Sequence, residues 1–124
     1  MNLDQYDNNA EKIGALAMHT YDEIAGFLDT LPKPIPMPTM MEVSIDDALD
    51  AMVAARRKLS SEPISEDARS AALMAILTWA SGVNLVMIER APDGSENYLL
   101  ELAAFQLLET AHHAQKVHRL LTAH

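Results

Sequence analysis

The chain contains no cysteine, and this absence excludes disulfide bridges, thiolate nucleophiles and thiolate metal ligands together. Glycine is scarce as well, with 4 in 124 residues, so the fibrous and low-complexity classes do not apply. Acids outnumber bases, 18 against 9, and the formal charge of −9 repels nucleic-acid phosphates and anionic lipid surfaces. We therefore expect neither a nucleic-acid partner nor a membrane partner.

Two stretches bear on the location of the protein. The opening residues, MNLDQYDNNAEK, have neither the basic nor the apolar region of a secretory signal, so we expect a cytoplasmic protein. Residues 71–88 are uncharged and approach the length of a membrane span. They include Thr78, Ser81 and Asn84, and neither flank carries the basic excess that orients a span. A buried central helix explains this stretch better.

Apolar residues recur at helical spacing along the chain, which predicts a single all-α domain over residues 1–124. Ser44 and Ser65 stand where N-caps are expected, with acidic residues in the turn that follows each of them. The spacing of Asp93 and Glu96 also suits a capping box. We expect helices at about residues 11–31, 44–59, 65–90 and from 93 almost to the C-terminus. The apolar side of the first helix consists of Ile13, Leu16, Ala17, Ile24, Phe27, Leu28 and Leu31.

Prolines at positions 32, 34, 36 and 38 interrupt the helical pattern. Polyproline II rises about 3.1 Å per residue, so residues 32–41 would span about 31 Å, the length of a 20-residue helix. An extended strap over residues 32–41 would return the chain along the first helix, and the second helix would then run parallel to the first. This predicts a four-helix bundle with one proline-rich crossover, in the order up, up, down, up. Side chains expected to pack the strap onto the helices are Ile35, Met37, Met40 and Met41.

A docking peptide for a proline-recognition domain is the alternative reading of the strap. Those domains bind prolines three residues apart, and this spacing does not occur here, because the prolines stand two apart. A structural strap is therefore the favoured interpretation.

The third and fourth helices are more apolar than one bundle requires. One apolar face of the third helix consists of Leu73, Ile76, Leu77, Ala80, Val83 and Met87, and the other faces carry Met74, Trp79, Leu85 and Val86. We therefore expect this helix to be buried all round. A second stripe consists of small residues that would let another helix approach closely: Ala71, Ala75, Thr78 and Gly82. The expected buried seam of the fourth helix consists of Leu100, Ala104, Leu107, Ala111, Ala114, His118 and Leu121.

Further apolar side chains lie off these seams, and Asn84 stands on the most apolar face of the third helix. Monomers rarely expose large apolar patches, so the surplus predicts a homodimer or a partner protein. The alternative is that the strap and the N-terminal residues of the same chain cover it. The side chains expected at an interface are Trp79, Asn84, Tyr98, Leu102 and Phe105.

Two weak metal-binding patterns offer an enzymatic alternative. Glu109 and His112 resemble, in one copy only, the Glu-x-x-His motif of di-iron carboxylate bundles. A second group of acids resembles half of the Mg²⁺ site of all-α nucleoside triphosphate pyrophosphohydrolases, whose helices carry Glu-x-x-Glu and Glu-x-x-Asp; these acids are Glu42, Asp46, Asp47 and Asp50. A hard cation needs several convergent oxygens, and the matching second helix is missing. The sequence contains no serine-nucleophile motif and no phosphate-binding loop.

These observations favour a small acidic helical protein that acts by protein–protein interaction, as an adaptor or regulator and as a homodimer. We expect no cofactor and no resident metal, and catalysis is the less favoured reading. The alternative is a divalent-metal-dependent enzyme of the pyrophosphohydrolase kind.

Overall fold

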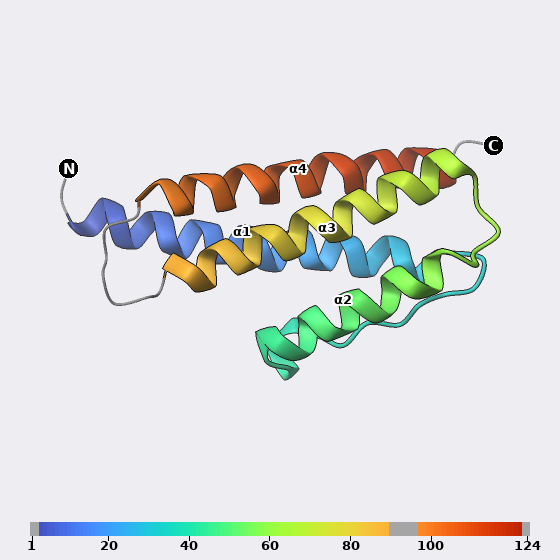
Figure 1. The fold of residues 1–124 in the computed structure, drawn as a ribbon, viewed down its shortest axis with the longest axis horizontal. Coiled ribbons are helices and arrows are strands. Elements are labelled where there is room, and N and C mark those ends of the chain that lie inside the picture. Colours follow the sequence, from blue (N-terminus) through green and yellow to red (C-terminus); the bar gives the residue numbers. More distant parts are fainter. Residues whose placement is uncertain (1–2, 90–96, 123–124) are drawn as a thin grey trace.

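The computed structural model describes the backbone of residues 3–89 and 97–122, and the side chains of residues 11–87 and 100–122. Within these ranges the chain is all-helical, without a strand, as predicted. Figure 1 shows long helices joined by loops, with one short 3-10 turn. The elements are α1 (Leu3–Asp29), η1 (Met40–Glu42), α2 (Ile45–Leu59), α3 (Glu66–Glu89) and α4 (Asn97–Thr122).

Serine caps fix two of the predicted helix starts. The Ser44 hydroxyl oxygen accepts the backbone N–H of Asp47 at 3.1 Å, and that of Ser65 accepts the N–H of Ala68 at 3.1 Å. Each bond satisfies an N–H group that has no partner inside the helix. α1 begins at Leu3, well before the predicted residue 11. The expected capping pair of residues 93 and 96 lies outside the described residues.

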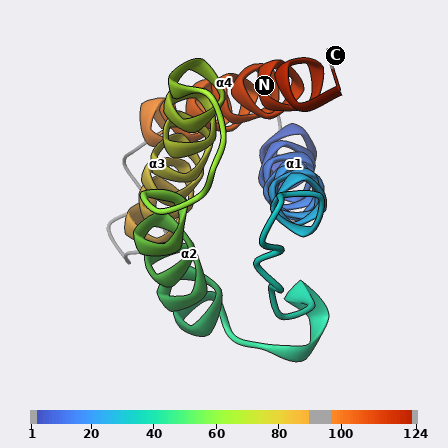
Figure 2. The same cartoon turned by 90° about the vertical axis from the view of Figure 1, so that its right-hand side faces the viewer.

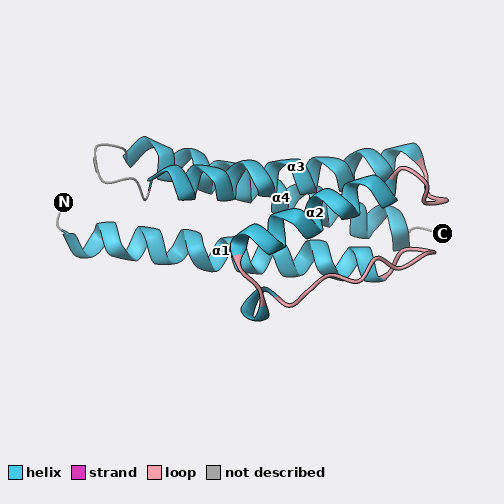
Figure 3. Cartoon of the chain, turned by 60° about the horizontal axis from the view of Figure 1, so that its bottom comes forward, coloured by secondary structure: helices cyan, strands magenta, loops and turns pink. Residues whose placement is uncertain are grey.

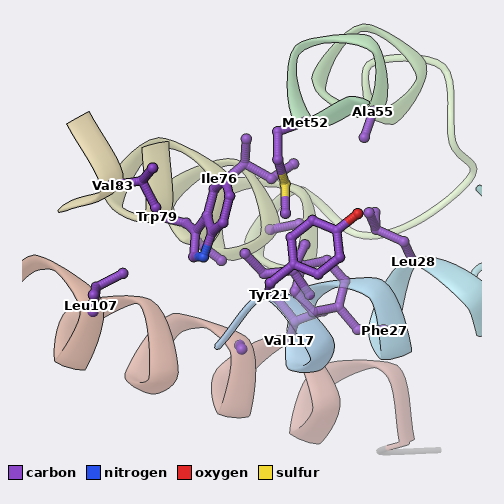
Figure 4. Close-up of a cluster of buried hydrophobic side chains, with 14 of the residues drawn as sticks. Tyr21, Phe27, Leu28, Met52, Ala55, Ile76, Trp79, Val83, Leu107 and Val117 are labelled. Atoms are coloured by element: carbon purple, nitrogen blue, oxygen red, sulfur yellow. The ribbon is translucent and has the colours of Figure 1, made fainter. Parts of the chain in front are cut away.

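α3 is the central helix of the fold. It packs extensively against α4 and also contacts α1 and α2, while α1 contacts α4. In the end view of Figure 2, α1, α4, α3 and α2 follow one another around an arc. All four helices contribute to one apolar core, part of which Figure 4 shows. The buried side of α1 is the predicted one, except that Leu16 is only partly buried: Ile13, Ala17, Ile24, Phe27, Leu28 and Leu31.

The apolar stretch that could be mistaken for a membrane span lies within α3. Residues Glu66–Met87 are long enough and apolar enough to cross a membrane, with a mean hydropathy of 1.6. A core helix has the same composition, and α3 contacts each of the other three long helices. These contacts account for part of its hydropathy, because 39% of the apolar window is buried.

Trp79 and Tyr21 join α3 to α1 inside the core. Both side chains are almost fully buried, and their ring centroids lie 5.4 Å apart in a tilted orientation. The Trp79 indole N–H donates a hydrogen bond to the Ala17 carbonyl oxygen at 2.9 Å, so the polar edge of this ring is satisfied inside the protein. Figure 4 shows both rings between α1 and α3. An aromatic pair of this kind adds about 0.5–1.5 kcal/mol beyond the area it buries.

The strap, residues 32–41, is extended up to η1 and lies beside α1 (Figure 3). The Ile35 N–H donates to the Leu28 carbonyl oxygen at 2.9 Å, and the Tyr21 hydroxyl donates to the Pro38 carbonyl oxygen at 2.6 Å. From Ile35 to Pro38 the strap advances three residues, about 9 Å in polyproline II, and from Leu28 back to Tyr21 the helix covers seven residues, about 10.5 Å. The two lengths agree, so the strap can run alongside α1 and form both bonds. Ile35 is buried as predicted, but Met41 is 84% exposed and does not pack onto the helices.

Glu62 and Arg69 hold the turn between α2 and α3. The buried Glu62 side chain accepts the Lys33 backbone N–H at 3.1 Å through Oε1, which ties this turn to the start of the strap. The Arg69 guanidinium donates to the Leu59 carbonyl oxygen at 3.2 Å and to that of Glu62, and it also pairs with Glu66. Leu59 is the last residue of α2, where carbonyl groups have no partner inside the helix, so this bond satisfies one of them.

Replacing Tyr21 by phenylalanine is expected to make the protein less sensitive to alkaline pH. Burial, and then the negative charge of Asp22, raise the pKa of the Tyr21 phenol above its ordinary value of 10.0. An unfolded chain therefore releases this proton more readily than the folded one, so the associated stability is present below about pH 10 and is lost as the pH rises above it. The urea concentration at the unfolding midpoint, measured at pH 7, 10 and 11, should fall more steeply with rising pH for the wild type than for Tyr21→Phe.

At pH 7 the same substitution should lower the free energy of unfolding by about 1 kcal/mol, because the bond to the Pro38 carbonyl is lost. Parallel pH profiles for the two proteins would show that Tyr21 is not the group responsible.

Candidate functional site

The small residues of α3 pack against α4, which sets the orientation of both helices. A Cβ atom built on Gly82 would lie 2.9 Å from Leu107 Cγ and 3.3 Å from the Ala103 carbonyl oxygen, so only glycine fits there. The hydroxyls of Thr78 and Thr110 meet at 2.8 Å in the same buried contact. The predicted stripe of small residues is therefore confirmed as the place where another helix approaches closely.

This close contact turns large apolar side chains of α3 outward. The exposed fractions are 48% for Leu77, 43% for Met74 and 39% for Met87. Leu77 and Met87 share a predicted apolar face with the buried Ile76 and Val83 but are exposed in the single chain, because the small residues and Trp79 take the buried side. Asn84 is also exposed, and helical spacing places it on the same side as Leu77.

α4 carries the matching exposed apolar side chains. Leu102 is 44% exposed, Phe105 57% and Leu108 53%. Leu102 and Phe105 point away from the buried side of α4, as expected. Tyr98 lies in the first turn of α4, outside the residues whose side chains the structure describes. We call the following set the outer face: Met74, Leu77, Asn84 and Met87 of α3 with Leu102, Phe105 and Leu108 of α4.

Trp79 does not belong to this surface. Its exposed fraction is 0%, and its N–H is bound to the Ala17 carbonyl of the same chain. The expectation that Trp79 meets a partner is therefore corrected, since α1 already covers it. In a helix that is apolar on every side, hydropathy alone does not show which of the large side chains points inward.

The acids of the pyrophosphohydrolase alternative are spread along η1 and the first turns of α2. Glu42, Asp46, Asp47 and Asp50 are all exposed. Among the described residues, no three His, Cys, Asp or Glu side chains lie close enough together to hold a metal ion. The acids at the start of α2 are placed where the helix dipole favours negative charge, which accounts for them structurally.

The structure does not pair the side chains of Glu109 and His112 either. His112 is exposed, and the imidazole near Glu109 belongs to His113 one residue later, with Nε2 and Oε2 3.9 Å apart. This is the ordinary i, i+4 contact of neighbouring turns on a helix. His118, expected in the buried seam of α4, is exposed as well.

An open groove of about 600 Å³ lies between the C-terminal halves of α1 and α4. Its charged residues are of both signs, Glu23 on one side and Arg119 on the other. Glu23 already contacts His19 at 3.2 Å. The groove is lined by Glu23, Gly26, Phe27, Thr30, Ala114, Gln115, His118 and Arg119. With mixed charge and an open wall, it presents no concentrated charge for an ion.

Several residues of the outer face were missed as surface candidates from the sequence, namely Met74, Leu77, Met87 and Leu108. A signal for three of them existed in α3, where one side carries small residues and the other large apolar ones. Because close helix packing selects the small side, the large side is left outward.

Comparison of the chain with protein families, with curated proteins and with solved structures finds no match.

Proposed function

We propose that the protein acts by protein–protein interaction through its outer face, and that it does so as a homodimer. One observation carries this proposal: among the side chains that the structure describes, six of the nine large apolar ones that are exposed lie on α3 and α4, which pack extensively against each other. Scattered exposed apolar residues are normal, whereas a concentration of them on two helices that pack together is typical of an interaction surface. Phenylalanine and methionine are also enriched in the cores of protein interfaces.

The composition supports a cytoplasmic location and a protein as the binding partner. The absence of cysteine suits a reducing compartment, and a cytoplasmic protein is what we propose. The charge of −9 disfavours a nucleic acid or an anionic membrane as the binding partner.

We also propose that the strap is the one long crossover of an up, up, down, up four-helix bundle. The hydrogen bonds of Ile35 to Leu28 and of Pro38 to Tyr21 support this order, because along the strap they meet α1 progressively farther from its end. A strap that returns along α1 allows α2 to start beside the middle of α1.

Replacing Leu102 and Phe105 together by aspartate is expected to weaken the homodimer. Two charges placed within an apolar contact should raise the dissociation constant about 100-fold or more. Sedimentation velocity over a range of concentrations measures the change. Val53→Asp is the matched control, because Val53 is 49% exposed but lies on α2, away from the outer face.

Circular dichroism checks that each variant keeps its helical content. A wild-type protein that stays monomeric at every concentration contradicts the homodimer. An unchanged dimer in the double variant contradicts the role of Leu102 and Phe105.

A further inference from the structure

The exposed side of α4 carries a second seam, one residue after the predicted buried one. Its members recur at steps of four, three, four, three and four, the spacing of a coiled-coil contact, and each of them is exposed. We call this set the outer seam: Glu101, Phe105, Leu108, His112, Gln115 and Arg119. The Phe105 and Leu108 side chains, 57% and 53% exposed, are its apolar part.

The outer seam is symmetric about residue 110 and carries opposite charges at its two ends. Glu101 and Arg119 are equally far from this midpoint, as are Phe105 and Gln115, and Leu108 and His112. If a second α4 lay antiparallel against the first, these residues would face each other in pairs. A two-fold axis of this kind makes the same patch serve both subunits.

We propose that the outer seam binds the outer seam of a second copy in antiparallel orientation, with Glu101 paired to Arg119 of the partner subunit. The proposal rests on the proposed homodimer and specifies how the two copies of α4 are arranged in it. Charge complementarity selects this occupant, because antiparallel pairing sets an acid against a base at both ends. Parallel pairing would set Glu101 against its own copy and Arg119 against its own copy, which is unfavourable.

The neighbours of the outer seam fit the same arrangement. Leu102 and Lys116 flank it on one side, so in the antiparallel pair the Lys116 stem can cover Leu102 of the partner subunit. Glu109 lies on this flank near the axis, where it faces its own copy, and this like-charge contact offsets part of the gain. The outer seam spans about 27 Å of helix, so the ion pairs close both ends of the contact.

Charge reversal tests the pairing in the full chain. Glu101→Arg and Arg119→Glu should each raise the dissociation constant of the dimer about tenfold, because each sets like charges together at two symmetric places. The double variant restores opposite charges and should return to within about threefold of the wild type. Asp50→Arg, an exposed acid of α2, is the control and should leave the constant unchanged within about twofold.

Sedimentation equilibrium gives the constants, and the results separate two failures. A dimer that Leu102→Asp with Phe105→Asp disrupts, but that the double charge reversal does not restore, overturns the antiparallel pairing and leaves the proposed function standing. A monomeric wild type overturns both. A wild type that binds a different protein through the outer seam, and not itself, also overturns this proposal.

Discussion

Replacing Trp79 by alanine is expected to lower the free energy of unfolding by about 3–5 kcal/mol, the range for deleting a buried large aromatic side chain. Trp79 is fully buried, packs against Tyr21 and donates to the Ala17 carbonyl oxygen. Its removal leaves a cavity between α1 and α3 and deprives that carbonyl of its side-chain partner. Urea unfolding followed by circular dichroism measures the loss.

Two further variants test whether burial of Trp79 causes this loss of stability. Trp79→Phe keeps a ring but loses the N–H, so its stability should lie between those of the wild type and Trp79→Ala, and it can be measured even if the alanine variant does not fold. Leu77→Ala removes a large apolar side chain of the same helix that is 48% exposed, and it should cost less than about 1 kcal/mol. Equal costs for Leu77→Ala and Trp79→Ala would contradict the assignment of the buried side of α3.

Replacing Gly82 by valine is expected to lower the free energy of unfolding by about 3 kcal/mol, at the upper end of the usual cost of overpacking. Even the first added carbon would stand 2.9 Å from Leu107 Cγ and 3.3 Å from the Ala103 carbonyl oxygen. The Leu107 side chain is fully buried and has no free space to move into, so α3 and α4 must separate. Thermal and urea unfolding both report this change.

A double-mutant cycle identifies the contact responsible. In a Leu107→Ala background the nearest obstacle is gone, so Gly82→Val should cost less than half as much there as in the wild type. Gly14→Val is the matched control, because a Cβ on Gly14 meets no atom within 4 Å, and it should change stability by no more than about 0.5 kcal/mol. Additive costs for Gly82→Val and Leu107→Ala would show that these two residues do not oppose each other.

The parts of the fold that depend on local chemistry could be predicted from the sequence. Ser44 and Ser65 begin helices because a hydroxyl caps a free N–H group, and this rule needs no tertiary information. The buried side of α1 follows from its periodicity because its opposite side is polar. Ile35 packs as expected, while Met41 does not, because η1 turns it outward at the end of the strap.

The orientation of α3 could not be predicted from hydropathy, because apolar residues surround it. Leu77 and Trp79 are both large and apolar, yet one is 48% exposed and the other is not exposed at all. The deciding factor is the close packing of Gly82 and Thr78 against α4, a relation between two segments far apart in the sequence. Leu102 and Phe105 could be predicted to face outward, because they lie opposite the periodic apolar seam of α4. The prediction that Trp79 lies at the surface is wrong, because its burial depends on contact with α1.

The fluorescence of the buried Trp79 side chain reports on the contact between α1 and α3. Trp79 is the single tryptophan of the chain, and it lies where α3 meets α1. Its fluorescence is therefore emitted from a dry site 5.4 Å from the Tyr21 ring, so excitation of that tyrosine reaches it efficiently. Separation of α1 from α3 would shift the emission to longer wavelength and end this energy transfer. An association that leaves the core intact would change neither signal, so one spectrum distinguishes assembly from opening.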